Sequence, residues 1–398
     1  MSVISKQIFY DAVKGVDCEQ MMHPWTSNCY KSSFQHIFYS IKGTGKFYLI
    51  IYILQLLVKG NKLRLDDIKQ QSLQLLQSTL FGSVFVITFV ASNCFFRNAM
   101  GRFHYYIFPG LTSALSAVSI FLENPKKRGV TVTSFLYLMF EVFVRYLEEF
   151  NYIHRTTGFE TFVFMICSAA LLYLLRIVKH QKSNLWFFLP PSFGKSKITD
   201  DKRHYCPHRG SCWDDIINNT AKYFGFGVLV QWLRATVPKF RKILKEPSLL
   251  NPFNLKTLKL GVFTGLYVMT YKMTSCFLCR YRKEDSPLHA IPSGLLAGLA
   301  YIIRPDLTVI LIAICNLLTL SEYHFKDKGL LPKWPFSEVA YIIASGILFH
   351  SQMVIPNCTP KQFVNLMHSF SYGKSTEINK RLWDYIAKSQ ELKKLASL

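Results

Sequence analysis

The sequence predicts an all-α polytopic membrane protein of about eight spans, arranged as two four-helix repeats that each follow a short interfacial or re-entrant apolar helix. Three observations predict this fold class. Half of the 398 residues are hydrophobic and 18% are charged, below the roughly 25% usual in soluble domains. Three long runs carry no formal charge: Thr79–Phe96, Tyr105–Leu122 and Val339–Pro356. Such a run spans a bilayer core of about 30 Å. The third observation is an internal similarity.

The similarity joins Tyr106–Phe121 in the first half to Leu288–Leu320 in the second. Proline and small residues recur in the same order at a nearly constant offset: Pro109 with Pro292, Gly110 with Gly294, Ala114 with Gly298, and Pro125 with Pro305. Upstream, Ser92-Asn93-Cys94-Phe95 corresponds to Thr274-Ser275-Cys276-Phe277. Small residues four apart let helix backbones approach closely in lipid. We therefore interpret the chain as two copies of one unit, and we expect each half to pack as a four-helix unit with Gly110 and Gly294 at close contacts.

The first half begins with a cysteine-containing segment, residues 1–46. The first membrane repeat, residues 47–178, opens with the apolar piece Phe47–Val58. Because a helix rises only about 1.5 Å per residue, this piece is too short to cross a bilayer core of about 30 Å, unless Ile37–Lys46 extends it. Four spans are predicted next, at about 79–96, 105–122, 130–147 and 159–178, by their apolar runs.

The second half is predicted from the same signals. Residues 179–222 form a polar linker with a second Cys/His motif. The second membrane repeat, residues 223–356, opens with the short apolar piece Tyr223–Trp232, and its spans are predicted at about 258–279, 288–303, 307–320 and 339–356 by their apolar runs. Residues 357–398 form a basic C-terminal tail, in which Ile378–Leu395 predicts a basic amphipathic helix.

Span number determines the topology. Four spans per half place both chain termini on one side, which we expect to be the cytosol. Five per half would give an inverted repeat, which is typical of transporters.

The net charge of +23 points to anionic lipid headgroups beside the spans. Nucleic acid is not predicted as a partner, because no zinc-finger, RRM or KH pattern is present. The first residues lack the apolar core of a secretory signal, so we expect internal spans to direct targeting. The ten cysteines are scattered, and several lie inside apolar runs. This favours reduced thiols over a secreted disulfide scaffold.

Two groups of residues offer zinc-ligand chemistry at matching places in the two halves. The candidate metal ligands are Cys18, His23 and Cys29 before the first short apolar piece, and Cys206, His208 and Cys212, with His204 nearby, before the second. Structural zinc usually takes four ligands in C-x(2–4)-C pairs, which neither group matches. Reduced thiols in a packed interfacial fold are therefore the favoured interpretation, and no cofactor is predicted. The alternatives are a metal site in these groups and one site shared by both halves.

Other polar residues in the spans have structural explanations beside functional ones. Cys276 and Cys279 form a C-x-x-C at a helix end, whereas the counterpart Cys94 stands alone, which favours packing over redox or metal function. Glu141 and Arg145 lie four residues apart and can pair on one helix face. Together with Lys272 they are also candidates for a transport pathway, since charges in spans often mark one. No catalytic motif is present, so the sequence predicts no enzyme and no catalytic residues.

Taken together, these residues resemble the transmembrane protein 135 family. The resemblance rests on Cys18-x4-His23-x-Trp25-x3-Cys29, on Cys206-Pro207-His208 with Cys212, on Thr274-Ser275-Cys276-Phe277-Leu278, and on Leu288-His289-Ala290-Ile291 running into Gly294–Gly298. The second half is more distantly similar to import-translocase subunits of the mitochondrial inner membrane and to related peroxisomal proteins.

The resemblance implies a multi-pass protein of mitochondrial and peroxisomal membranes that affects mitochondrial fission, peroxisome organisation and lipid metabolism without catalysis. Membrane lipids and the mitochondrial division machinery are the partners it suggests. The basic linker and tail give a physical route to either partner. The alternative function is a channel or carrier for lipids or other solutes.

Overall fold

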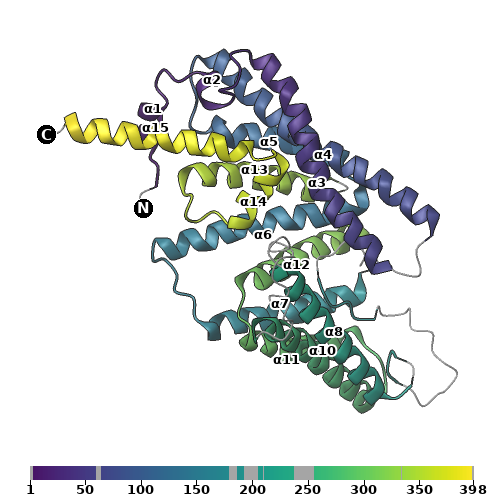
Figure 1. Ribbon diagram of the computed structural model, residues 1–398. Coiled ribbons are helices and arrows are strands. Elements are labelled where there is room, and N and C mark those ends of the chain that lie inside the picture. The colour runs from purple at the N-terminus through teal and green to yellow at the C-terminus, as the bar shows by residue number, and fades with distance from the viewer. Residues whose placement is uncertain are drawn as a thin grey trace. The chain divides into compact units, whose positions relative to one another are not determined.

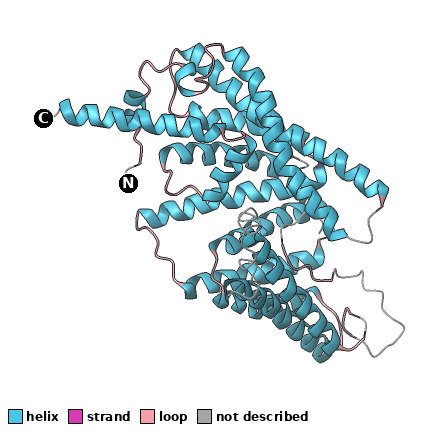
Figure 2. Ribbon diagram, in the orientation of Figure 1, coloured by secondary structure: helices cyan, strands magenta, loops and turns pink. Residues whose placement is uncertain are grey.

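The computed structural model describes residues 3–59, 64–178, 186–191, 205–208, 210–236, 255–332 and 334–396. Within these ranges the regular structure is entirely helical (Figure 2), which confirms the all-α fold class. The chain divides into two compact units. Unit 1 comprises Met1–Ile153 and Pro335–Leu398, and unit 2 comprises His154–Trp334.

Unit 1 is built around two long neighbouring helices, α3 and α4 (Figure 1). Its helices are α1 (Lys6–Ala12), α2 (Cys18–Met21), α3 (Cys29–Lys59), α4 (Leu65–Met100), α5 (Thr112–Ala117), α6 (Pro125–Glu149), α13 (Phe336–Val354), α14 (Lys361–Phe370) and α15 (Lys374–Ala396). Polar contacts join α3 to α4, where Thr44 Oγ1 lies 3.0 Å from Ser83 Oγ and Tyr52 Oη lies 3.1 Å from Ser78 Oγ. α13 packs against α5 and α6.

Unit 2 combines one helix pair with a group of three helices. Its helices are α7 (Thr157–Ile177), α8 (Cys212–Thr236), α10 (Leu255–Arg282), α11 (Ala290–Gly298) and α12 (Leu307–Asp327). α8 packs along α10, and Thr264 Oγ1 of α10 donates a hydrogen bond to the Tyr223 carbonyl of α8 at 2.8 Å. α7 packs against α11 and α12.

The two apolar stretches that resemble each other are both irregular helices. The first consists of a π turn at Ile107–Leu111, α5, and a 3-10 turn at Val118–Leu122. The second consists of a 3-10 turn at Pro287–His289, α11, and a 3-10 turn at Leu299–Ile303. The predicted break before α12 is confirmed, because Pro305 cannot continue a helix and the Asp306 carboxylate accepts from the Thr308 N–H at 3.0 Å as the N-cap.

Four helices among the described residues are long and apolar enough to cross a membrane. These are Leu65–Met100, Lys127–Glu149, Thr157–Ile177 and Leu307–Asp327. They cover four of the eight predicted spans. The stretches Ile107–Leu122 and Pro287–Ile303 are shorter apolar helices, and α10 and α13 are not among the four. The total of eight spans therefore stays a prediction.

The short apolar pieces predicted at Phe47–Val58 and Tyr223–Trp232 are parts of longer helices. α3 has 31 residues and α8 has 25. Each continues toward its N-terminus through polar residues, so hydropathy alone marks only the apolar part of the helix. The predicted region boundaries at residues 46 and 222 consequently fall inside helices.

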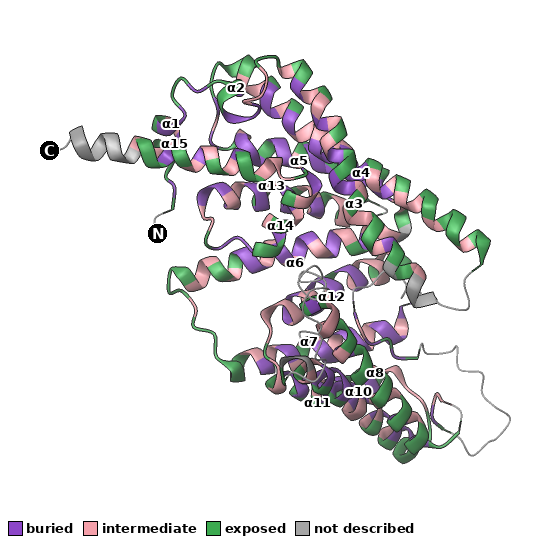
Figure 3. Ribbon diagram, in the orientation of Figure 1, coloured by how far each residue is buried: buried purple, intermediate pink, exposed green. Residues whose placement is uncertain are grey.

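The outer faces of the spans carry large apolar side chains. Figure 3 shows exposed residues along these helices, and they include Leu80, Phe95, Phe143, Phe162, Ile166 and Leu318. A soluble protein rarely exposes so much contiguous apolar surface. Lipid contact explains these faces.

The last span of each predicted repeat belongs to the unit that holds most of the other repeat. α7, from the first half of the sequence, lies in unit 2, and α13, from the second half, lies in unit 1. The expectation that each half packs as its own four-helix unit is therefore wrong. The packing of α7 in unit 2 and of α13 in unit 1 depends on how well the helix surfaces fit together. Local hydropathy does not report this fit.

Small residues lie at the contacts that α7 and α13 make in their units. A Cβ added at Gly294 would lie 2.7 Å from Ala169 Cα of α7, and one added at Gly298 would lie 2.6 Å from Met165 Cα. In unit 1, a Cβ at Gly110 would lie 3.4 Å from His350 Cβ of α13. The prediction of a close helix contact is confirmed at Gly294, whereas a Cβ at Gly110 would make an ordinary van der Waals contact with the His350 side chain.

The amphipathic helix predicted in the tail is present as α15. Its apolar stripe of Ile378, Leu382 and Ile386 is buried in unit 1 together with Phe9 and Val13 of the N-terminal segment. These side chains are therefore occupied by protein contacts and do not provide the membrane-surface contact that the sequence suggested.

Candidate metal centres

Unit 1 brings four ligand-type side chains together near the start of α3. Cys18 begins α2, His23 follows that helix, Cys29 begins α3, and Cys94 lies on α4. One ligand atom from each lies within 4.8 Å of all the others. We call these four residues the N-terminal cluster. Cys18, His23 and Cys94 are buried.

His23 is oriented by the backbone. Its Nδ1 donates a hydrogen bond to the Thr26 carbonyl at 2.7 Å, which leaves Nε2 for the thiols. The residue is 0% exposed, and Nε2 makes no hydrogen bond. A buried ring nitrogen without a partner is costly. Backbone hydrogen bonds of this kind also fix the tautomer of metal-binding histidines.

The electrostatics of the N-terminal cluster favour a thiolate beside a charged imidazole. A hydrogen bond from Cys94 is the largest influence that lowers the pKa of Cys18, to about 5, and His23 and Arg97 lower it further against the opposing effect of burial. Burial acts to lower the pKa of His23, but the neighbouring Cys18 sulfur and the Thr26 carbonyl raise it to about 9. Thiolate is the form in which cysteine binds metal.

A polar contact holds α2 against α4 beside the N-terminal cluster. Arg97, one turn after Cys94, forms an ion pair with Asp17, which directly precedes Cys18. Arg97 Nη2 also donates to the Val16 carbonyl at 3.4 Å. Cys29 Sγ lies 3.9 Å from Asn98 Nδ2, an amide that can donate to sulfur. The four side chains are thus positioned by their surroundings.

Unit 2 contains a second set of four. Cys206 and His208 precede α8, Cys212 begins α8, and Cys276 lies on α10. Their ligand atoms also lie within 4.8 Å of one another. We call these residues the linker cluster. Cys206 Sγ lies 3.7 Å from Cys212 Sγ, and His208 Nε2 lies 3.3 Å from Cys276 Sγ.

The linker cluster has an ion pair beside it as well. Lys272, one turn before Cys276, lies 2.5 Å from Asp215 of the first turn of α8. Hydrogen bonds from Cys276 and Cys279 hold the pKa of Cys206 well below its usual range. The hydrogen bond with Cys206 raises the pKa of His208. The ion pair between Lys272 and Asp215 joins α10 to α8, and this structural role accounts for the charge of Lys272.

A third group, Cys279, Asp285 and His289, also comes within 4.8 Å. Its carboxylate is engaged elsewhere, because Arg176 Nη2 donates to both oxygens of Asp285 at 2.7 and 2.6 Å. Cys279 Sγ lies 3.5 Å from His289 Nδ1. With three candidate ligands and one already paired with arginine, this group fits a hydrogen-bonded core better than a metal site.

Each of the two clusters with four residues has the donors of a closed structural metal site. Three thiols and one imidazole are a common ligand set for structural zinc. A fourth protein ligand leaves no open position for water or substrate, so the geometry supports a structural and not a catalytic role. All ten cysteines are free in the structure.

The structure brings together the candidate residues predicted from the sequence and adds one to each group. Cys18 joins His23 and Cys29, and Cys206 joins His208 and Cys212. His204 lies outside the described residues. Each group gains its own fourth member, so a site shared between the halves is not needed.

The sequence analysis missed the two added residues, Cys94 and Cys276. The expectation that Cys94 stands alone is wrong, because α4 carries it back to Cys18 at the start of α2. The signal was present, since Cys94 and Cys276 correspond to each other in the alignment of the halves. Local spacing hides it, because nearly the whole of α3 and most of α4 separate Cys29 from Cys94 in the sequence.

The charged pair inside α6 has the local geometry expected of it. Arg145 Nε and Nη2 donate to Glu141 Oε1 at 3.0 and 2.6 Å. Glu141 is buried, whereas the Arg145 side chain is 42% exposed. The two residues neutralise each other within one turn.

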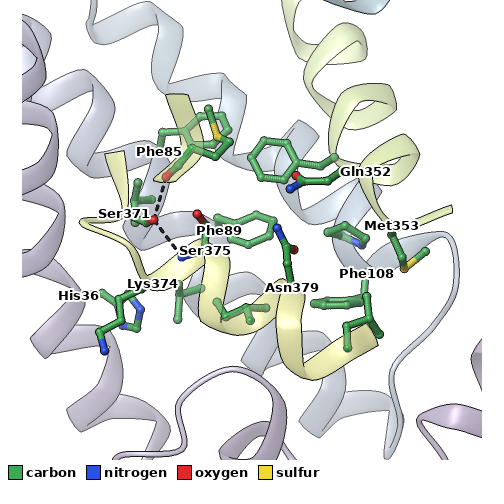
Figure 4. Close-up of a pocket in the computed structure, with 17 residues that line it drawn as sticks. His36, Phe85, Phe89, Phe108, Gln352, Met353, Ser371, Lys374, Ser375 and Asn379 are labelled. Atoms are coloured by element: carbon green, nitrogen blue, oxygen red, sulfur yellow. Dashed lines mark hydrogen bonds between the residues drawn. The ribbon is translucent and has the colours of Figure 1, made fainter. Parts of the chain in front are cut away.

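Unit 1 also contains an apolar pocket of about 690 Å³, counting space open to its surroundings. Figure 4 shows Phe85, Phe89, Phe108 and Met353 around it, with His36, Ser371, Ser375 and Lys374 gathered at one end. Ser371 Oγ accepts from the Ser375 N–H at 2.9 Å. Lys374 Nζ lies 3.0 Å from Glu377 and 4.3 Å from the Trp25 ring centroid. The pocket thus has an apolar body and a polar end.

The spans, the exposed apolar faces and the Cys/His clusters define a class of protein: a multi-pass helical membrane protein. The family model for the N-terminal cysteine-rich region of transmembrane protein 135 matches residues 15–147. Over that part of the chain, the match supports the resemblance to the transmembrane protein 135 family predicted from the sequence. The match contains the whole N-terminal cluster. No solved structure matches the chain.

Proposed function

We propose that this protein is a non-enzymatic component of mitochondrial or peroxisomal membranes that regulates mitochondrial fission, peroxisome organisation and lipid metabolism. The family match over residues 15–147 carries this proposal. The architecture that goes with it is eight spans derived from two repeats, with both termini in the cytosol. Basic surface outside the spans contacts anionic lipid headgroups and a division machine recruited to the same face.

The electrostatics of the spans support a role without transport of ions through them. Glu141 is neutralised by Arg145, and Lys272 is neutralised by Asp215. Charges that serve a translocation pathway usually face water or a substrate. Here Glu141 and Arg145 pair within one turn of α6, and the Lys272–Asp215 pair joins α10 to α8.

The test is the effect of protein dosage on organelle shape. Cells that lack the native gene and cells that overexpress the full chain are imaged with mitochondrial and peroxisomal markers. We expect longer mitochondria without the protein and fragmented mitochondria in excess, together with changes in peroxisome number and stored lipid. Unchanged morphology in both, or residence in the endoplasmic reticulum or plasma membrane alone, contradicts the proposal.

The second candidate function is binding or transfer of lipids or acyl species, and the apolar pocket of unit 1 favours it. Ligand sites are typically concave, mostly apolar, and have a few polar groups that fix orientation. The aromatic residues of the pocket suit an acyl chain. Its polar end beside Lys374 suits a carboxylate or phosphate headgroup, although Lys374 must then share its charge with Glu377.

Blocking the pocket tests this candidate. Val86→Phe adds bulk in the lining, and Val130→Phe makes the same change on the half-exposed surface of α6. We expect purified Val86→Phe protein to retain less co-purifying lipid or fluorescent fatty acid than wild type and Val130→Phe. Equal retention by all three proteins rejects the pocket as the binding site.

A further inference from the structure

We propose that the protein contains two structural zinc sites, each of the Cys3His type. The first takes the N-terminal cluster of Cys18, His23, Cys29 and Cys94. The second takes the linker cluster of Cys206, His208, Cys212 and Cys276.

The distances in the linker cluster match those around one tetrahedral ion. Zinc binds sulfur at about 2.3 Å and imidazole nitrogen at about 2.0 to 2.1 Å, so tetrahedral geometry separates two sulfurs by about 3.8 Å and sulfur from nitrogen by about 3.5 Å. Cys206 Sγ and Cys212 Sγ are 3.7 Å apart, and His208 Nε2 and Cys276 Sγ are 3.3 Å apart. A disulfide would require about 2.05 Å.

The N-terminal cluster supports the same conclusion through an unsatisfied atom. His23 is fully buried, its Nδ1 is used by the Thr26 carbonyl, and its Nε2 has no hydrogen-bond partner. Coordination to zinc satisfies this nitrogen. The backbone carbonyl then acts as the outer partner that orients a zinc-bound histidine.

The two clusters have the same construction although they lie in different units. In each, three ligands precede or begin a helix, namely α3 or α8, and the fourth comes from the long helix that packs beside it, namely α4 or α10. The fourth ligands, Cys94 and Cys276, occupy corresponding positions in the two halves of the sequence. Chance packing of thiols does not account for two such arrangements.

Ligand type and spacing favour zinc over other metals. Sulfur and imidazole donors exclude magnesium and calcium, which prefer oxygen. All donor atoms of a cluster lie within 4.8 Å of one another, a distance that surrounds one ion. Binding displaces the protons of the thiols and of any charged imidazole, so the metal-bound state is favoured as pH rises.

Each site attaches a polar segment to the membrane body. Zinc in the first site joins α2 and the start of α3 to α4, and zinc in the second joins the end of the linker to α10. Because the ion binds the folded arrangement and not the unfolded chain, it stabilises these attachments. The ion pairs Arg97–Asp17 and Lys272–Asp215 lie beside the sites and support the same connections.

The metal content of the purified full chain tests the proposal. Protein in detergent, prepared without added chelator, is measured by mass spectrometry of the elements. We expect about two zinc ions per chain for wild type, about one for Cys94→Ser, about one for Cys276→Ser, and none for the double variant. The control variants Cys358→Ser and Cys315→Ser change buried cysteines outside both clusters and should retain two. Wild type without zinc, or single variants that retain two ions, overturns the proposal.

Two further measurements keep the test decisive if a serine variant fails to fold. Cys94→His replaces one zinc ligand by another and should retain more metal than Cys94→Ser. In wild-type protein, a thiol reagent should modify the cluster cysteines slowly, and removal of zinc by a chelator should accelerate this reaction, whereas the rate at Cys358 should stay the same. Equal reactivity with and without chelator contradicts metal ligation.

Discussion

Adding one methyl group at Gly298 should destabilise unit 2, although it improves helix propensity. Alanine is favoured over glycine inside a helix by about 1 kcal/mol. At Gly298, however, the new Cβ would lie 2.6 Å from Met165 Cα and 3.1 Å from Met165 N. Carbon atoms pack at about 3.5 to 4.0 Å, so α11 and α7 must separate by roughly 1 Å. Overpacking of this kind typically costs about 1 to 3 kcal/mol.

Gly225 provides a matched control on α8. A Cβ built there meets no atom within 4 Å, so Gly225→Ala gains helix propensity without a clash. We expect Gly225→Ala to hold or raise the free energy of unfolding and Gly298→Ala to lower it. The difference should be about 1 to 3 kcal/mol, because both variants gain helix propensity and only Gly298→Ala has the clash. The measurement is SDS-induced unfolding of purified protein, with the melting temperature in mild detergent as a second readout.

Equal stability of the two alanine variants would contradict this expectation. If Gly298→Ala unfolds at the same SDS concentration as Gly225→Ala, the two helices do not approach as closely as the structure places them. Gly294→Ala, whose Cβ would lie 2.7 Å from Ala169 Cα, should behave as Gly298→Ala does, because both residues line the same contact with α7.

Three further predictions concern other parts of the fold. Arg176→Met should lower the unfolding free energy by about 3 to 5 kcal/mol. The Arg176 side chain is 1% exposed, and its loss leaves the Asp285 carboxylate without its ion-pair partner. Arg155→Met, at a more exposed pair, should cost under about 1 kcal/mol, and equal losses would contradict this account. Leu382→Ala should release α15, because it removes a buried contact worth about 2 to 5 kcal/mol; faster proteolysis of the tail is the readout, and an unchanged rate would show that α15 is held by other contacts. Tags at the two termini should show the same protease sensitivity in intact organelles, and protection of one tag alone would exclude an even number of spans.

The sequence by itself determined the helical class, the membrane character and most helix breaks. Hydropathy reports these directly, because lipid requires each spanning segment to satisfy its own backbone hydrogen bonds and to be apolar over a known length. Pro305 and Asp306 marked the start of α12, and Gly294 marked a close helix contact. The resemblance to the transmembrane protein 135 family could likewise be stated from the cysteine-rich start and the motifs of the second half.

Only the tertiary structure decided which helices pack together and how the ligand-type residues combine. The positions of α7 and α13 depend on the fit between helix surfaces, which is a property of two segments and not of either one. The fourth member of each Cys/His cluster is equally non-local, since Cys94 and Cys276 reach their partners only because α4 and α10 fold back beside α3 and α8. A periodic or spacing-based signal reports contacts within one segment, so it shows three residues of each cluster and cannot show the fourth.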